Sequence, residues 1–419
     1  MFDREHLLLA AGAVALAFGC NGSSGGSNTS SGRSTAPVTS KTVGTVTSGT
    51  KTGTGTVTSG TTVKTTTPTA SNFLYVTNFA SSTITTFDLD GKTGVPTLAA
   101  TPDTSLPAGF GPIAIAVDPT GKIAWCTGDG TVNAMSNQVM PLDISGGKLT
   151  AGTATATTSP WPVAIAVNPK LTAIYTADEN PAQSSGTVSM FVYTAGTGAI
   201  QAGGSANCGT LSGPVGVACD PTGSWLFVSD RNDQGVQSIP LTNGVLGTPG
   251  ALVTNGSTNG GPYPIVVNPA GTFLWTGNTD GTISTYPLTN GNLGTATTTP
   301  ATNSTTAAYP QSLALDPAGK TLVSANGGSA LGGGSDDVAA FSIGASGTPT
   351  LLGSPVMISG ACPAGVVFNQ SGTVVYAANY GNNTISAFTV SATGLTAISG
   401  SPYAIPATDS GPIGVAVTR

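Results

Sequence analysis

The sequence predicts an all-β protein, a seven-bladed β-propeller of four-stranded antiparallel blades. Three observations predict this fold class: one phrase recurs along the chain, each copy joins two apolar runs through a tight turn, and the two ends of the repeat region complement each other. The copies recur roughly every 50 residues, a period typical of propellers and other repeat arrays. They begin at Pro112, Pro162, Pro214, Pro262, Pro310, Pro363 and Pro412.

The turn inside each copy is encoded by an Asx residue, a proline and a glycine. In the copy that begins at Pro310 these are Asp316, Pro317 and Gly319. As in a type I turn, the Asx side chain caps the backbone of the turn, the proline ring fixes φ, and the glycine tolerates the backbone conformation where the chain leaves the turn. The copy at Asn168 lacks the glycine and the copy at Asn369 lacks the proline, so neither is obligatory. We expect a tight hairpin in each copy.

The first apolar run of each copy does not alternate with polar residues, as in IAIAV at 113–117 and VAIAV at 163–167. Such a strand is covered on both faces, as expected near a common axis. The second run carries an aromatic column, followed three residues later by an Asx column. The aromatic column is Trp125, Tyr175, Phe227, Trp275, Val323 and Tyr376, and the second column is Gly128, Asp178, Asp230, Asn278, Asn326 and Asn379. A third strand, such as TISTYPL at 282–288, and a weaker fourth complete the blade.

The two ends of the repeat region predict a closed ring. The first repeat begins at Asn72 with FLYVTN and lacks a proline-led first strand, whereas residues 411–419, GPIGVAVTR, form a first strand and nothing else. Pairing these two segments completes a seventh blade. It also removes the exposed edges that an open array would leave.

The region before the propeller has the composition of an export signal and a linker. Residues 1–20 resemble a bacterial lipoprotein signal with Cys20 as the lipidated residue, and plain secretion is the alternative. Residues 21–70 are rich in Ser, Thr and Gly and predict a disordered stalk, which leaves 71–419 for the propeller. We therefore expect an envelope or secreted protein that meets a membrane only through its anchor.

Charge and cysteine content narrow the function further. The net charge is −6, the pI is near 4.5 and only 7% of residues are charged, which argues against nucleic-acid binding. No cofactor is required by any motif. We expect Cys126 and Cys219 to be buried free thiols, because they occupy apolar strand positions in non-adjacent blades. Cys208 and Cys362 fall in loops of one face, and a disulfide between them stays open.

The variable loops lie on the face opposite the tight turns, and variable loops on a rigid scaffold are where function tends to sit. Acids gather in these loops, with Arg231 as the cation among them. They form either a solubilising surface or a negative potential for a basic ligand. The candidate ligand-binding residues are Trp161, Asp178, Glu179, Arg231, Tyr263, Asp280, Tyr309, Asp336 and Asp337.

Two groups of these loop residues suggest specific ligands. Asp230, Asn232 and Asp233 resemble the first half of a calcium loop, although Leu241 stands where the last carboxylate is needed. The aromatic residues at blade entries, including Trp161, form either a platform for a sugar or peptide or plugs between blades.

Tyr75-Val76-Thr77-Asn78 followed by STITTFDLDGKTG resembles the YVTN-type propeller repeat, and GPIAIAVDPTGKIAW at 111–125 extends the likeness. The chain from 72 to 419 is similar to the lactonase-like seven-bladed propellers, which include 6-phosphogluconolactonase-type enzymes. The resemblance implies lactone opening by His, Arg and Glu. This chain has a single His, His6, in the signal, so Asp178, Glu179, Asp230 and Arg231 are the candidate catalytic residues.

Two functional hypotheses follow. The first is an exported, monomeric propeller that binds a protein or carbohydrate through an acidic loop face, or that serves as a surface-structural module. The alternative is a lactonase-like hydrolase that opens a sugar lactone.

Overall fold

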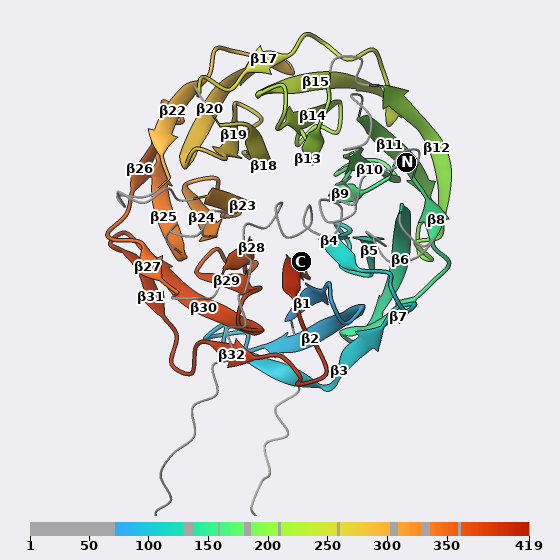
Figure 1. Cartoon of the computed structure of the whole chain (residues 1–419), viewed down its shortest axis with the longest axis vertical. Coiled ribbons are helices and arrows are strands. Elements are labelled where there is room, and N and C mark those ends of the chain that lie inside the picture. The colour runs from blue at the N-terminus through green and yellow to red at the C-terminus, as the bar shows by residue number, and fades with distance from the viewer. Residues whose placement is uncertain are drawn as a thin grey trace, which may run out of the picture. The chain divides into compact units, whose positions relative to one another are not determined.

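The computed structural model describes residues 72–128, 137–157, 160–179, 186–207, 211–257, 260–301, 309–327, 336–358 and 362–418. Within these ranges seven antiparallel sheets surround one axis, which confirms the predicted seven-bladed propeller (Figure 1). We number the blades 1 to 7, and blade 1 is the sheet that contains both β1 (Asn72–Asn78) and β33 (Pro412–Val417). No helix in these ranges is long and apolar enough to cross a membrane.

The strands of each blade follow one another from the axis outwards. The innermost strands of blades 1 to 7 are β33 (Pro412–Val417), β4 (Pro112–Val117), β9 (Pro162–Val167), β13 (Pro214–Cys219), β18 (Pro262–Val267), β23 (Tyr309–Leu315) and β28 (Pro363–Phe368). The second strands are β1 (Asn72–Asn78), β5 (Ile123–Gly128), β10 (Ala173–Asp178), β14 (Trp225–Asp230), β19 (Phe273–Asn278), β24 (Thr321–Gly327) and β29 (Val374–Asn379). The third strands are β2 (Thr83–Leu89), β6 (Gln138–Ser145), β11 (Thr187–Tyr193), β15 (Gly235–Thr242), β20 (Thr282–Thr289), β25 (Asp337–Ile343) and β30 (Thr384–Ser391).

The outer edge of the blades is less regular. It is one strand in blades 1 and 3, namely β3 (Pro96–Ser105) and β12 (Ile200–Asn207). In the other five blades it is split into two short strands, so that the sheet has five pieces. These are β7 (Lys148–Ala151) and β8 (Thr155–Ala156), β16 (Val245–Leu246) and β17 (Val253–Thr254), β21 (Asn292–Leu293) and β22 (Thr297–Pro300), β26 (Pro349–Leu351) and β27 (Val356–Met357), and β31 (Gly394–Ala397) and β32 (Tyr403–Ala404).

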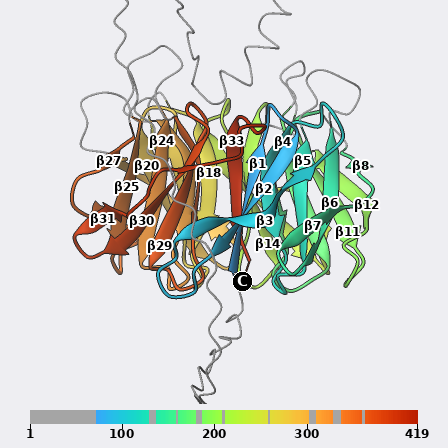
Figure 2. The ribbon, with the colours of Figure 1, turned by 90° about the horizontal axis from the view of Figure 1, so that it is seen from below.

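The ring closes in blade 1 as predicted. The sheet order is β3-β2-β1-β33, and β33 pairs antiparallel with β1 through Val76↔Val415 and Leu74↔Val417 (Figure 2). Beyond the strands, the Thr418 backbone amide donates to the carbonyl oxygen of Phe73 at 3.0 Å. Pairing across the closure leaves blade 1 with the same inner strands as its neighbours.

The Asx-led turns adopt the predicted geometry and define one face of the ring, the turn face. In blade 4 the Gly223 amide donates to the Asp220 carbonyl oxygen at 3.0 Å, and Asp220 Oδ1 accepts from the amides of Ser224 and Trp225 at 2.8 Å. Gly223 has a φ of +71°, which favours glycine. We call the opposite face, where the innermost strands begin, the entry face.

At five of the seven junctions the residue of the aromatic column joins its blade to the next one by a hydrogen bond. The Trp125 indole nitrogen donates to the Gly198 carbonyl oxygen at 3.0 Å, and Gly198 lies in the turn between the third and fourth strands of the following blade. Each of these aromatic side chains is fully buried and its polar tip finds a carbonyl, as buried Trp and Tyr require. The other such bonds are Tyr75–Gly147, Tyr175–Gly244, Trp275–Gly347 and Tyr376–Gly94.

Candidate functional site

The ends of the second strands present a repeated set of side chains on the entry face. The residue after each Asx-column position is held over its own blade by a backbone bond. The Glu179 amide donates to the Trp161 carbonyl oxygen at 2.9 Å, and the Arg231 amide donates to that of Gly213 at 3.0 Å. We call these the rim residues: Phe79, Glu179, Arg231, Thr279, Gly327 and Tyr380.

A second set follows the prolines of the innermost strands. In every blade the register between the first two strands shifts directly after the proline. A bulge at this point leaves a residue unpaired and re-aims its side chain. We call these the bulge residues: Ile113, Val163, Val215, Tyr263, Gln311, Ala364 and Ile413.

Two rim residues form the only ion pair among the described residues. Arg231 Nη2 contacts Glu179 Oε1, so the side chains of blades 3 and 4 meet. The Glu179 side chain is 6% exposed and the Arg231 side chain is 26% exposed. Burial raises the pKa of Glu179, and the Arg231 guanidinium opposes this shift only in part. The pair therefore places a carboxylate of increased basicity beside a cation.

Two tyrosines extend the pair into blades 5 and 6. The Arg231 guanidinium interacts with the Tyr309 phenol and opposes the rise of its pKa, and the rings of Tyr263 and Tyr309 lie 6.5 Å apart. Burial raises the pKa of both phenols, so both hydroxyls stay protonated and able to donate. Glu179, Arg231, Tyr263 and Tyr309 come from four consecutive blades, and we call them the mouth cluster.

The blades on the other side of the axis are apolar at the same level. The bulge residues Ile113, Ala364 and Ile413 form one cluster, against which the rim residues Phe79 and Tyr380 pack. The mouth of the axis thus has an apolar half in blades 7, 1 and 2 and a polar half in blades 3 to 6. A ligand with one polar edge and one apolar edge matches this division.

The candidate acids Asp178, Asp230 and Asp337 lie inside the blades, fully buried, and differ from the exposed acidic surface that we expected. Asp178 accepts from Thr176 Oγ1 at 2.7 Å and from Ser189 Oγ. Asp337 Oδ1 accepts from Asn326 Nδ2 at 2.7 Å. A buried carboxylate is stable only when donors surround it, and these donors come from the same strand or from the neighbouring one. The placement gives these acids a structural role.

Asp280, Asp336 and Trp161 are half-buried at the entry face. Asp280 accepts from Ser257 Oγ of the loop before β18 and from Thr282 Oγ1 at 2.7 Å, so its carboxylate is occupied by groups of its own blade and of that loop. Trp161 contacts the mouth cluster through its carbonyl, which accepts from the Glu179 amide. Trp161 therefore borders the cluster, whereas Asp280 and Asp336 are not among the residues that form it.

The predicted calcium residues instead bind the neighbouring loop. Asp230 Oδ2 accepts from the Gly213 amide at 2.8 Å, and Asp233 Oδ2 accepts from the Ser212 amide at 2.7 Å. Asn232 Nδ2 donates to the Ser212 carbonyl oxygen at 3.3 Å. Among the described residues no group of three or more His, Cys, Asp or Glu side chains is placed to hold a metal ion. Calcium binding stays a prediction.

The cysteine predictions are in part confirmed. Cys126 and Cys219 are free thiols, and burial raises the pKa of both. Cys362 is disulfide-bonded. Cys208 and Cys20 lie outside the described residues, as does any disulfide or lipid attachment that involves them.

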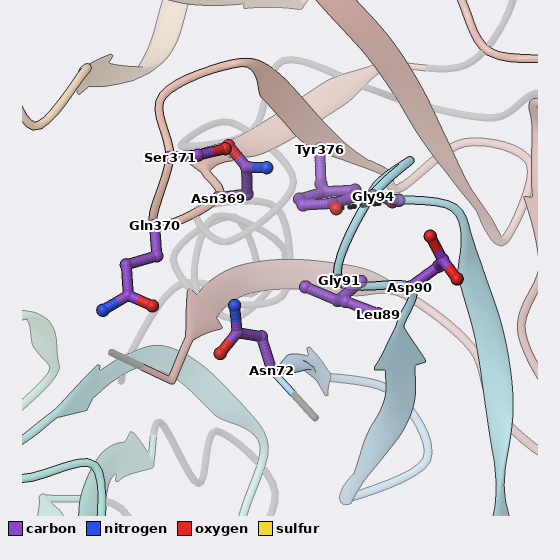
Figure 3. A pocket seen from close by; sticks show the side chains of 9 residues that line it. All are labelled: Asn72, Leu89, Asp90, Gly91, Gly94, Asn369, Gln370, Ser371 and Tyr376. Carbon is purple, nitrogen blue, oxygen red and sulfur yellow. Dashed lines mark hydrogen bonds between the residues drawn. The ribbon is translucent and has the colours of Figure 1, made fainter. Parts of the chain in front are cut away.

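A separate pocket of about 340 Å³ opens on the turn face between blades 7 and 1, as Figure 3 shows. Its lining includes Asn72, Asp90, Asn369 and Gln370. In blades 4 to 7 the turn glycine packs on the preceding turn, as Gly372 does on Pro317. Blade 1 has no such turn, because β33 and β1 are separate segments of the chain, and the turn of blade 7 therefore stays uncovered. The pocket therefore exists because blade 1, where the ring closes, has no turn that could cover the turn of blade 7.

Sequence reasoning missed Gln311, a bulge residue beside the mouth cluster. Its side chain is buried, and neither its amide nitrogen nor its amide oxygen has a hydrogen-bond partner. The signal was present in the repeat, because five of the seven bulge residues are aliphatic and only Tyr263 and Gln311 are polar.

These observations define a closed seven-bladed propeller with a polar cluster at one mouth of its axis. The family model for the lactonase seven-bladed β-propellers matches residues 57–247 and 271–412, and the chain belongs to this family.

Solved structures agree with this assignment at the level of the fold. A candidate 6-phosphogluconolactonase from Bacteroides uniformis has a TM-score of 0.69 at 18% identity and covers 83% of this chain and 100% of its own. The periplasmic gluconolactonase PpgL of Pseudomonas aeruginosa has a TM-score of 0.67 at 16% identity, covering 83% and 99%. A protein from Lactobacillus plantarum reaches 0.68 at 15% identity, with the same coverage. No curated protein sequence matches the chain.

Proposed function

We propose that this propeller hydrolyses the lactone of an unphosphorylated sugar acid at the mouth cluster, on the outside of the cell. One observation carries the proposal: a buried carboxylate and its guanidinium partner stand together on the entry face, with two protonated phenols in the next two blades. Family membership and the gluconolactonase named among the structural neighbours favour the same chemistry. The expected signal and Cys20 anchor support action at the envelope.

The mouth cluster contains the groups that lactone hydrolysis needs. Glu179 takes a proton from a water molecule as the water oxygen attacks the lactone carbonyl carbon. Arg231 and the Tyr309 hydroxyl stabilise the negative charge that forms on the carbonyl oxygen. The ring C–O bond then breaks, and the departing oxygen takes the proton from Glu179. The product is the open hydroxy acid, and Glu179 is again a carboxylate.

The charge of the entry face favours an unphosphorylated substrate. The described residues contain a single arginine, Arg231, which Glu179 already neutralises. Their lysines are Lys92, Lys122, Lys148, Lys170 and Lys320, all of which lie in or next to the turns of the turn face. A phosphate dianion at the mouth would thus lack the cations that phosphate sites use.

A panel of lactones tests the proposal. Purified propeller is assayed by pH-stat against galactono-1,4-lactone, glucono-1,5-lactone and 6-phosphogluconolactone, with spontaneous opening subtracted. We expect turnover of the first two, little of the third, and a loss of about 100-fold or more in Glu179→Gln. The control is Asp118→Asn, which removes an acid of the turn face. Absence of turnover on every lactone contradicts the proposal. Stabilisation by gluconate without turnover favours the binding module instead.

A further inference from the structure

Gln311 occupies a place in the ring where other blades present apolar side chains. It is the residue displaced by the bulge in β23, between the pairs Pro310↔Asn326 and Ser312↔Ala325. Its neighbours in the ring are Tyr263 of blade 5, whose ring lies 6.5 Å from that of Tyr309, and Ala364 of blade 7, which belongs to the apolar half of the mouth. Gln311 therefore stands where the polar half of the mouth meets the apolar half.

The carboxamide of Gln311 is buried without hydrogen bonds. The residue is 4% exposed, and neither Nε2 nor Oε1 has a partner. Buried amides in native proteins are nearly always hydrogen-bonded, so an amide with both ends open requires an explanation. The adjacent rim position is Gly327, which has no side chain that could bond the amide.

The geometry around Gln311 connects it to the mouth cluster. Tyr309, a member of the mouth cluster, lies two residues earlier on the same strand. Gln311 Nε2 lies 3.5 Å from the position that a Cβ atom on Gly327 would occupy, so the amide faces the end of the second strand, where rim side chains stand in other blades. An amide offers both a donor and an acceptor, which together match a hydroxyl or a pair of adjacent hydroxyls.

We propose that Gln311 is a specificity-determining residue, whose carboxamide binds hydroxyl groups of a polyhydroxylated lactone held at the mouth cluster. This inference rests on the proposed function and adds the residue that separates hydroxylated substrates from bare lactone rings. A site built to bond a hydroxyl rejects the analogue that lacks it, because its buried polar groups are then left unpaired. The neutral amide selects by hydrogen bonding, whereas Arg231 and Glu179 act by charge.

The test compares Gln311→Leu with a matched control, Gln237→Leu. Gln237 is also 4% exposed, but its Nε2 donates to the Gly250 carbonyl oxygen at 2.7 Å in the third strand of blade 4. We measure kcat/KM for glucono-1,5-lactone and for δ-valerolactone, which has the same ring without hydroxyls, together with Tm. Gln311→Leu should lower kcat/KM for the hydroxylated lactone by about 10-fold, through KM, and leave δ-valerolactone unchanged.

The two substitutions should have different effects on the Tm of the wild type. Gln311→Leu removes an amide that has no partner and should keep or raise Tm, whereas Gln237→Leu breaks a bond and should lower it. An equal loss on both lactones, no change on either, or a lower Tm in Gln311→Leu overturns the inference. If the wild type opens no lactone, the readout is the rise in Tm with gluconate. That rise should be lost in Gln311→Leu, and its absence from the wild type also contradicts the inference.

Discussion

The hydroxyl of Tyr376 donates a hydrogen bond to the carbonyl oxygen of Gly94 at 2.6 Å, although the two residues are 282 positions apart in the chain. This bond joins blade 7 to blade 1 across the closure. Four other blade junctions have the same bond between an aromatic tip and a turn glycine. The closure is thus built like these junctions, and the contribution of its bond to the free energy of unfolding can be measured.

Tyr376→Phe should lower the free energy of unfolding by about 1 kcal/mol, because it removes a buried hydrogen bond and leaves the Gly94 carbonyl without this donor. Urea unfolding measures the difference. Tyr403→Phe is the control, since its hydroxyl bonds Ser399 within one blade at an exposed site and should contribute little. Equal effects of the two variants would contradict a special contribution of the closure bond.

The repeat allowed the blades and the closure to be predicted, because apolar runs and Asx-led turns are local patterns. The bonds between aromatic tips and glycines join segments about 70 residues apart, so no local pattern shows them. Asp178 and Asp230 were expected on the surface. The residues at the same repeat position in other blades, Asn278, Asn326 and Asn379, are buried, and so are these two acids. An Asx at this position bonds groups of its own blade, and the charged side chains that reach the mouth, Glu179 and Arg231, come one residue further.

The ion pair of the mouth cluster should make stability depend on pH once one partner is removed. Arg231 lowers the pKa of Glu179 against the larger effect of burial. In Arg231→Ala the folded-state pKa of Glu179 rises further above its unfolded value. The stability that this shift contributes is present below the unfolded pKa and is lost as pH rises through the folded one. We expect a loss of about 2 kcal/mol at pH 8, below the ~3–5 typical of fully buried pairs, and less at pH 5.

The double variant Glu179→Gln/Arg231→Ala serves as the control for this effect. It removes the buried carboxylate together with its counter-charge, so it should recover much of the stability at pH 8 and lose the pH dependence. Urea unfolding at both pH values gives the comparison. A double variant as unstable as Arg231→Ala at pH 8 would show that packing of the arginine stem, and not charge, accounts for the loss.

A carboxyl pair in blade 1 gives a second pH dependence. Asp409 is buried and accepts from Thr83 Oγ1 at 2.8 Å and Thr85 Oγ1 at 2.6 Å. Burial, together with the adjacent charge and hydrogen bond of Asp409, raises the pKa of Asp103 to about 6. The protonated form is therefore favoured by folding, and its contribution is present below the unfolded pKa near 3.8 and is lost as pH rises through about 6.

Asp103→Asn should keep a donor toward Asp409 at every pH. The variant should gain stability over the wild type as pH rises from 4 to 7, by less than about 1 kcal/mol, since Asp103 is only slightly buried and solvent screens its charge. Thermal unfolding over this range measures the gain. Asp143→Asn removes the same charge from an exposed site on β6 and should show no such trend. A gain that is the same at pH 4 and pH 7 would exclude the carboxyl pair as its cause.

The turn that receives the Tyr376 bond contains two glycines with different requirements. Gly94 has a φ of +70°, and a Cβ atom there would lie 2.7 Å from Val374 Cγ2 in the neighbouring blade. Gly91, three residues earlier, has no heavy atom within 4 Å of that position and no positive φ. Gly94→Ala should therefore lower the free energy of unfolding by about 2 kcal/mol, from backbone strain and the contact with Val374, whereas Gly91→Ala should change it by under about 0.5 kcal/mol.

Combining Gly94→Ala with Tyr376→Phe decides whether the turn and the bond act as one unit. Because the substitution displaces the carbonyl that accepts from Tyr376, the two losses should not add, and a double-mutant cycle in urea should give a coupling of about 0.5 kcal/mol or more. Strict additivity would mean that the Gly94 turn stabilises blade 1 by itself, without contributing to the closure.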